Sequence, residues 1–222
     1  MSEKKEKWKI FKLGELVKIL NGYAFKKSDF SLSGIPVLKI KNIKSPIVNT
    51  SDVQFINENI YKKQSKFKVN YNDILISMTG SHIDQPNSVV GRVGRFREKK
   101  GIFLINQRVG KISTKNEKIL DSDFLYYFLS QKKVTYNLAS CAGGSANQAN
   151  IGNKDIQNID IKLPDIQVQR KIAKILIFLD EKIELNNEIN NNLLFYIIIV
   201  ILQVLCWIYL FPLIKALEVL FF

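Results

Sequence analysis

The longest regular pattern of apolar positions lies between residues 161 and 193. Leu163-Pro164 fits the end of a strand, because proline has no amide hydrogen to donate to a sheet ladder. Asp165 suits a helix start, where its carboxylate can accept free amide hydrogens of the first turn. Steps of three and four then predict a helix that packs along another helix. The positions of this seam are Ile172, Ile175, Leu179, Ile183, Asn186, Ile189 and Leu193.

The seam allows two interpretations. Buried against a partner helix, each aliphatic side chain would contribute roughly 1.5 to 3 kcal/mol. Asn186 would lower the stability of that pairing but could fix its register. The alternative is that the seam packs on the chain's own domain. We favour the partner helix, because the seam is long and follows a proline that ends a domain.

Residues 8–164 have a different pattern, with short β-branched and aromatic runs separated by Gly, Asn, Asp and Pro. Strands are expected within residues 34–43, 73–80, 89–96 and 103–112, and an amphipathic helix at 122–130. Alternation in 34–43 predicts that Lys39 and Lys41 face away from Leu38 and Ile40. These patterns predict an α+β fold, a strand-rich domain followed by a long helix.

Residues 193–214 are almost wholly apolar, which meets a length criterion for a transmembrane helix. A shifted reading frame in AT-rich DNA would also produce such a tail, since its codons favour Ile, Leu, Phe and Tyr. We favour a frameshift or truncation over a membrane segment.

The net charge of +13 is concentrated in residues 1–164, which hold 28 basic and 14 acidic residues. A basic domain of this size suggests a polyanionic partner, and nucleic acid is the commonest one. A generally lysine-rich proteome would give the same excess. The charged N-terminus lacks the apolar region of a signal peptide, and Cys141 and Cys206 have no metal-ligand spacing. A cytoplasmic location is therefore expected.

The sequence offers little catalytic chemistry. It contains no glycine-rich phosphate loop, and a single histidine, His82, excludes multi-histidine metal sites. Asp73 and Asp84 would be candidates for a metal-dependent nuclease, but Asp73 follows Asn72 in a turn-like context. We expect a binding subunit with no catalytic residue, no metal and no cofactor of its own.

Several motifs occur in an order and at spacings that resemble the specificity subunit of type I restriction-modification enzymes, over residues 8–193. The strongest runs from Leu163-Pro164 to Asn190 and resembles the spacer helix of that family. Gln169 occupies a glutamine position of the motif, and Val168 replaces the usual glutamate. The other motifs are Trp8 with Leu13-Gly14, Gly22-Tyr-Ala-Phe25, Gly34-Ile-Pro36, Asn72-Asp-Ile-Leu-Ile76 with Gly80, Asn106-Gln107 and Gly144-Ser-Ala-Asn-Gln-Ala-Asn-Ile151.

The resemblance implies a non-catalytic subunit that reads double-stranded DNA within a larger complex. Such subunits carry two target-recognition domains, each reading half of a bipartite site, and their spacer helices pack as an antiparallel coiled coil. Modification subunits bind S-adenosylmethionine and methylate adenine, and a separate restriction subunit supplies the ATP- and Mg-dependent motor and nuclease. This chain would hold one recognition domain (1–164), one helix (165–193) and an atypical tail (194–222). It would need a second copy or another chain.

DNA recognition needs phosphate contacts for affinity and base-edge contacts for sequence, both suited to polar loops. Besides Lys39 and Lys41, we expect three clusters to supply these contacts, although solvated loop polarity would explain each residue equally simply. Arg95 and Arg97 would share one strand face, and Asn and Gln can pair with adenine edges. The first cluster is Ser77, Thr79, Ser81, His82, Gln85 and Asn87; the second is Arg92, Arg95 and Arg97; the third is Ser145, Asn147, Gln148 and Asn150.

Three hypotheses remain open. The first is the DNA-recognition subunit. The second is a membrane-anchored basic protein that uses the apolar tail, and the third is a stand-alone nuclease.

Overall fold

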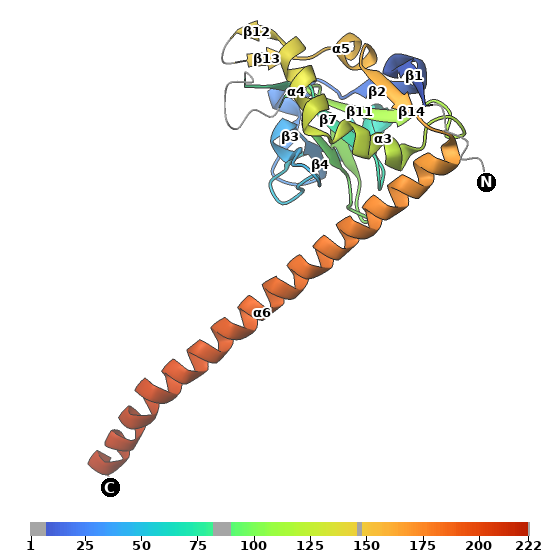
Figure 1. The fold of residues 1–222 in the computed structure, drawn as a ribbon. Coiled ribbons are helices and arrows are strands. Elements are labelled where there is room, and N and C mark those ends of the chain that lie inside the picture. Colours follow the sequence, from blue (N-terminus) through green and yellow to red (C-terminus); the bar gives the residue numbers. More distant parts are fainter. Residues whose placement is uncertain (1–7, 82–89, 146–147, 222) are drawn as a thin grey trace, which may run out of the picture. The chain divides into compact units, whose positions relative to one another are not determined.

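A computed structural model describes residues 8–81, 90–145 and 148–221, with side chains except at residues 144, 145, 148 and 204–221. The chain divides into two units, Met1–Ala173 and Lys174–Phe222. The first unit contains the sheets and the shorter helices, and the second is the remainder of the long helix α6 (Figure 1).

The elements have these bounds. The strands are β1 (Lys9–Lys12), β2 (Val17–Asn21), β3 (Phe30–Ser31), β4 (Ile35–Leu38), β5 (Gln54–Ile56), β6 (Lys68–Val69), β7 (Ile74–Ser77), β8 (Thr79–Gly80), β9 (Val93–Arg95), β10 (Phe103–Ile105), β11 (Val109–Thr114), β12 (Gly143–Ser145), β13 (Gln148–Asn150) and β14 (Asp160–Leu163). The helices are α1 (Leu13–Leu16), α2 (Glu58–Gln64), α3 (Ser122–Leu129), α4 (Lys132–Cys141), α5 (Asn153–Gln157) and α6 (Ile166–Phe221), with 3-10 turns η1 (Lys27–Asp29), η2 (Ile40–Asn42) and η3 (Ser65–Phe67).

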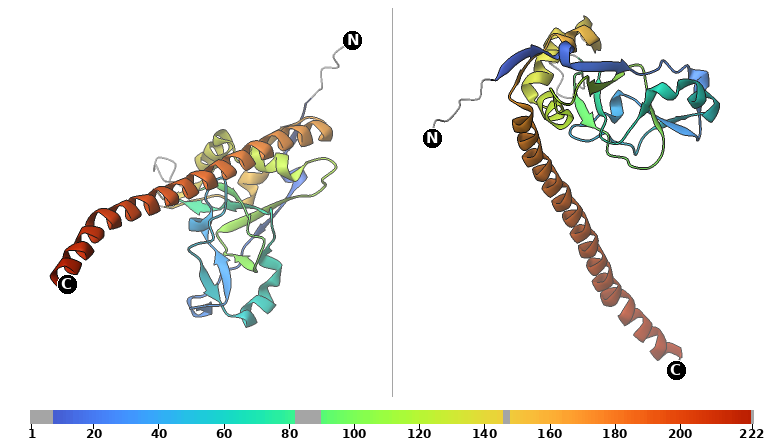
Figure 2. Two further views of the ribbon diagram at one scale, coloured as in Figure 1. Left: turned by 90° about the horizontal axis from the view of Figure 1, so that it is seen from below. Right: turned by 90° about the vertical axis from the view of Figure 1, so that its right-hand side faces the viewer.

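A four-stranded sheet, in the order β2-β11-β7-β9, separates two hydrophobic cores. Side chains alternate across a strand, so β7 sends Ile74 and Ile76 into one core and Leu75 into the other. The first core also receives side chains from α3, α4 and the start of α6. The second lies against the five-stranded sheet β3-β5-β4-β10-β6, in which β4 and β10 run parallel. Figure 2 shows this domain from two further sides.

The α+β fold with a long C-terminal helix is confirmed, as are the strand end at Leu163 and the helix after Asp121. The Asp121 carboxylate caps α3 by accepting from the Asp123 and Phe124 amides at 3.1 and 3.0 Å. Asp165 directly precedes α6, and its carbonyl accepts from the amides of Val168 and Gln169.

Each of the four expected strand regions holds a shorter strand or is divided into two, and the regions 34–43 and 103–112 show why. The strand within 34–43 ends at Leu38, because the buried side chain of Asn42 accepts from the Lys39 amide and folds the next residues into η2. The strand within 103–112 is divided into β10 and β11. Between them, the backbone of Tyr23 donates to Ile105 and accepts from Gln107. Gly22 is needed there, since an added Cβ would lie 2.3 Å from the Ile105 carbonyl oxygen.

Candidate nucleic-acid interface

A small three-stranded sheet brings two of the three predicted polar clusters together. Its order is β12-β13-β8, and Ala149 and Asn150 of β13 pair with Gly80 and Thr79 of β8. The hairpin β12–β13 is labelled in Figure 1. The strands β8 and β13, which are far apart in sequence, therefore lie side by side.

Two members of the first predicted cluster, Ser77 and Thr79, lie inside the protein. Ser77 is fully buried and donates through Oγ to the Thr79 carbonyl at 2.8 Å. Thr79 is also buried, and its Oγ1 donates to Oδ1 of Asn150 at 2.7 Å. Asn150 itself is exposed. Ser77 and Thr79 therefore have supporting hydrogen bonds inside the protein, and direct DNA contact by either stays a prediction.

The remaining members are described to different extents. Ser81 is partly buried and follows β8 directly. The backbones of Ser145 and Gln148 pair with each other in the hairpin. His82, Gln85, Asn87 and Asn147 lie outside the described residues. For all of these residues, DNA contact stays a prediction.

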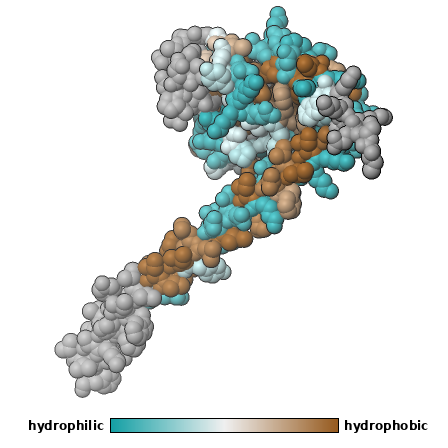
Figure 3. Space-filling model, viewed as in Figure 1, coloured by the Kyte–Doolittle hydropathy of each residue, from teal (hydrophilic) through white to brown (hydrophobic). Residues whose placement is uncertain are grey.

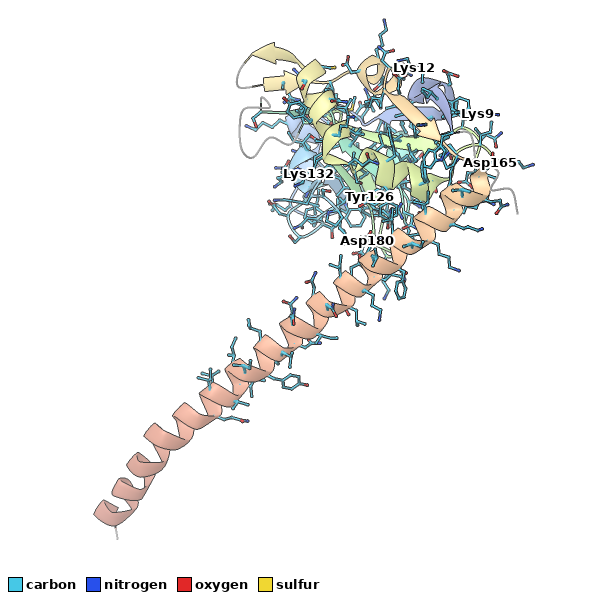
Figure 4. All side chains as sticks on the ribbon, viewed as in Figure 1. Lys9, Lys12, Tyr126, Lys132, Asp165 and Asp180 are labelled. Atoms are coloured by element: carbon cyan, nitrogen blue, oxygen red, sulfur yellow. The ribbon has the colours of Figure 1, made fainter. Side chains whose placement is uncertain are left out.

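The arginine cluster is divided between the interior and the surface. Arg95 is 3% exposed, donates through Nη1 to Oδ1 of Asp123 at 2.7 Å, and lies 4.1 Å from the ring centre of Tyr126 on α3. Figure 4 labels Tyr126. A guanidinium held in this way has a structural role, and a DNA contact by Arg95 stays a prediction.

The other two arginines are partly buried. Arg97 lies beyond the end of β9 and donates to Oδ1 of Asn72 at 2.7 Å. Arg92 follows Gly91 and accepts through its carbonyl from the Ser77 amide, which places its backbone beside the end of β7. Arg92 and Arg97 therefore remain candidate contacts. Sequence reasoning missed Asp123 and Tyr126 as partners of Arg95, because they lie some 28 residues away and no local pattern links them.

Lys39 and Lys41 lie at the turn η2 rather than on the face of a strand, so their predicted placement was wrong. Lys39 contacts Oε1 of Gln54 and lies 4.3 Å from the ring centre of Phe30. Partial burial, and secondarily the neighbouring charge of Lys41, lower the pKa of Lys39. Lys41 is exposed and pairs with Asp52 at 2.6 Å. An exposed ion pair of this kind is weak, and a phosphate contact by Lys41 stays a prediction.

Asp73 has a structural role. Its Oδ2 accepts from the Asn70 amide at 2.8 Å and lies 3.1 Å from Nζ of Lys111. In the part of the chain that the structure describes, no three His, Cys, Asp or Glu residues are grouped as a metal site would need.

The start of α6 is fixed to the domain by Gln169, which is 1% exposed. Its Oε1 accepts from the Asp121 amide at 3.0 Å. Its Nε2 donates to the carbonyls of Ile119 and Pro164, both at 2.9 Å. The spacer-helix motif drew attention to Gln169. No local pattern in the sequence predicted that Gln169 would bind the loop at 119–121. The same loop supplies Asp121, the cap of α3.

The seam of α6 is divided between two environments. Ile172 is partly buried and packs against the first core, as the alternative interpretation expected, and its contact with a partner helix stays a prediction. The later positions of the seam are exposed: Ile175, Leu179, Ile183, Asn186, Ile189 and Leu193. Figure 3 shows both apolar and polar residues along α6.

Comparisons with known proteins agree with this arrangement. The fold is that of solved specificity subunits: the subunit from M. genitalium superposes with a TM-score of 0.56 at 20% identity, over 83% of this chain and 42% of that chain. The subunit from Thermoanaerobacter tengcongensis gives 0.54 at 18% identity, over 82% and 40%. The model of the type I restriction modification DNA specificity domain matches residues 5–194, and the chain belongs to this family.

Among curated relatives, the MjaVIII specificity subunit of Methanocaldococcus jannaschii is 28% identical over 186 residues, which are 82% of this chain and 42% of that protein. The EcoAI specificity subunit of Escherichia coli is 32% identical over 104 residues, 41% of this chain and 18% of that protein. The chain spans about two fifths of the length of the relatives that it matches most fully.

Among the described residues, one helix, over Ile166–Gln203, is long and apolar enough to cross a membrane. That test uses length and composition alone, and none of the comparisons supports the membrane alternative.

Proposed function

We propose that this chain reads one half of a bipartite DNA target and directs methyltransferase and nuclease subunits to it. The match of residues 5–194 to the DNA specificity domain carries this proposal. The basic charge of residues 1–164 supports it, because phosphate contacts supply much of the affinity of DNA-binding proteins. The pairing of β8 with β13, which brings Thr79 beside the exposed Asn150, supports a site for base-edge contacts.

In the proposed division of labour, residues 1–164 recognise DNA and residues 165–193 form the spacer helix. The exposed seam from Ile175 onward supports pairing with another helix, since apolar side chains left in water favour burial. That helix would come from a second copy or another chain. Adenine methylation with S-adenosylmethionine, and ATP- and Mg-dependent cleavage, would belong to partner subunits in the cytoplasm. Residues 194–222 would be a product of truncation or frameshift.

Two lysines in similar ion pairs give a matched test of the proposed interface. Lys41 pairs with Asp52, and Lys12 on β1 pairs with Asp160 at 2.7 Å (Figure 4 labels Lys12). We expect Lys41→Ala to weaken binding of all duplexes alike and to reduce the slope of log K against log salt by about 0.9, the value for one lost phosphate contact. Lys12→Ala should leave the slope unchanged.

The measurement uses the full chain assembled with its matching modification subunit, titrated with duplex DNA over a range of salt. The selected base sequence should be the same for both variants, because a phosphate contact carries no sequence information. Equal slopes for wild type, Lys41→Ala and Lys12→Ala would remove Lys41 from the interface. Salt-independent binding by the wild type would contradict DNA recognition itself.

A further inference from the structure

The hydrogen bond between Thr79 and Asn150 joins two segments that are 71 residues apart in sequence. Thr79 belongs to β8, and Asn150 ends the hairpin β12–β13. Their backbones are paired directly, and the amide of Ile151 donates to the Met78 carbonyl at 2.9 Å just beyond them. The side-chain bond therefore reinforces a short ladder where the two candidate DNA-contacting segments meet.

Backbone hydrogen bonds fix a third segment at the same place. The amide of Gly91 donates to the Ser77 carbonyl at 2.8 Å, and the amide of Ser77 donates to the Arg92 carbonyl at 2.9 Å. Gly91 has a φ of +72°, a conformation that favours glycine. Gly91 and Arg92 are thus paired with the end of β7, two residues before β8 begins.

The two side chains of the bond have different exposures. Thr79 is 6% exposed, so its hydroxyl is enclosed by the protein, whereas Asn150 is exposed. Because Oδ1 of Asn150 accepts from Thr79, the amide group is oriented and its Nδ2 hydrogens are directed elsewhere. Such hydrogens suit acceptors on base edges, such as N7 of a purine or O4 of thymine.

We propose that Thr79 is a positioning residue for sequence specificity. It orients the Asn150 amide and holds the hairpin against β8, so that the two segments read DNA as one surface. This inference rests on the proposed function. Sites that bind by hydrogen bonds depend on side chains locked by supporting contacts, and loss of the hydroxyl would leave Asn150 free to rotate.

The test compares Thr79→Val, which has nearly the same shape without the hydroxyl, with Thr79→Ser, which restores it. Ser130→Ala is a matched control, since the Ser130 hydroxyl donates to the Tyr126 carbonyl at 2.8 Å, away from the hairpin. Two quantities are measured on the full chain assembled with its modification subunit. One is amide hydrogen exchange at residues 149–151, and the other is the ratio of affinities for the selected duplex and a scrambled one.

We expect Thr79→Val to speed exchange in the hairpin and to lower the affinity ratio about tenfold, with binding to scrambled DNA unchanged. A bidentate base contact is worth about 1 to 3 kcal/mol of discrimination, and the tenfold change expected for the Asn150 amide, 1.4 kcal/mol, lies near the lower end of that range. Thr79→Ser should restore both quantities, and Ser130→Ala should change neither.

Two outcomes would overturn the proposal in different ways. If the wild-type complex prefers its selected duplex and Thr79→Val keeps the same ratio, Thr79 has no positioning role. If the wild-type complex shows no sequence preference, the proposed function fails and this inference fails with it. Hydrogen exchange then still reports whether the bond stabilises the hairpin.

Discussion

Replacement of Asp123 by alanine should lower the free energy of unfolding by about 3 kcal/mol. The variant leaves the Arg95 guanidinium in the interior without its carboxylate, and breaking a buried ion pair in this way typically costs about 3 to 5 kcal/mol. The lower end applies because the side chain of Asp123 is 36% exposed while that of Arg95 is 3% exposed. Urea unfolding followed by circular dichroism gives the value.

A second variant separates the unpaired charge from general loss of packing. When Arg95→Met is added to Asp123→Ala, no buried charge remains, and the double variant should be more stable than Asp123→Ala alone. Asp123→Asn, which keeps an acceptor oxygen near Arg95, should lose less than Asp123→Ala. A double variant less stable than Asp123→Ala would show that the ion pair is not what stabilises this part of the domain.

Replacement of Gln169 by leucine should also cost about 3 kcal/mol. Leucine has a similar volume but satisfies none of the three backbone groups that Gln169 bonds, the part-buried Asp121 amide and Ile119 carbonyl and the buried Pro164 carbonyl. Each buried polar group left without a partner costs about 1 to 3 kcal/mol, and local rearrangement recovers part of the sum.

Gln167→Leu is the matched control, because Gln167 lies two residues earlier on α6 and is exposed. Its effect should stay within about 0.5 kcal/mol, as is usual at the surface. Thermal unfolding of both variants beside the wild type decides the matter. Equal midpoints for the two variants would mean that Gln169 does not fix the start of the helix.

These two contacts show where sequence reasoning reached its limit. The motif around Gln169 and the pattern of α6 were readable, because helix periodicity and capping are local properties of the chain. The loop that Gln169 holds, at 119–121, is some 50 residues earlier and becomes its neighbour only in the folded domain. The partners of Arg95 were unreadable for the same reason.

The polar clusters illustrate a second limit. Composition identified polar clusters within 77–87 and 145–150 as candidate contacts, and the ladder between β8 and β13 brings Thr79 and Asn150 together. The same composition could not separate an internal hydroxyl such as Thr79 from an exposed amide such as Asn150. That distinction depends on burial, which short polar segments do not encode.

Lys39 and Lys41 show how one side chain can change a local prediction. Alternation of apolar and basic residues predicted a strand through both lysines. Asn42 instead bonds to the Lys39 amide and, through Nδ2, to the carbonyls of Asn49 and Asp52 at 3.0 and 2.8 Å. Asparagine competes with the sheet ladder for backbone groups, so the strand ends at Leu38.

The measurement that bears most directly on DNA recognition is the sequence context of methylated adenines. The full chain would be assembled with its matching modification subunit, supplied with S-adenosylmethionine and incubated with a random duplex library. We predict methylation confined to one bipartite sequence, with two inverted copies of a single half-site if the partner is a second copy of this chain. Efficient methylation without any common sequence would contradict a role for this chain in specificity.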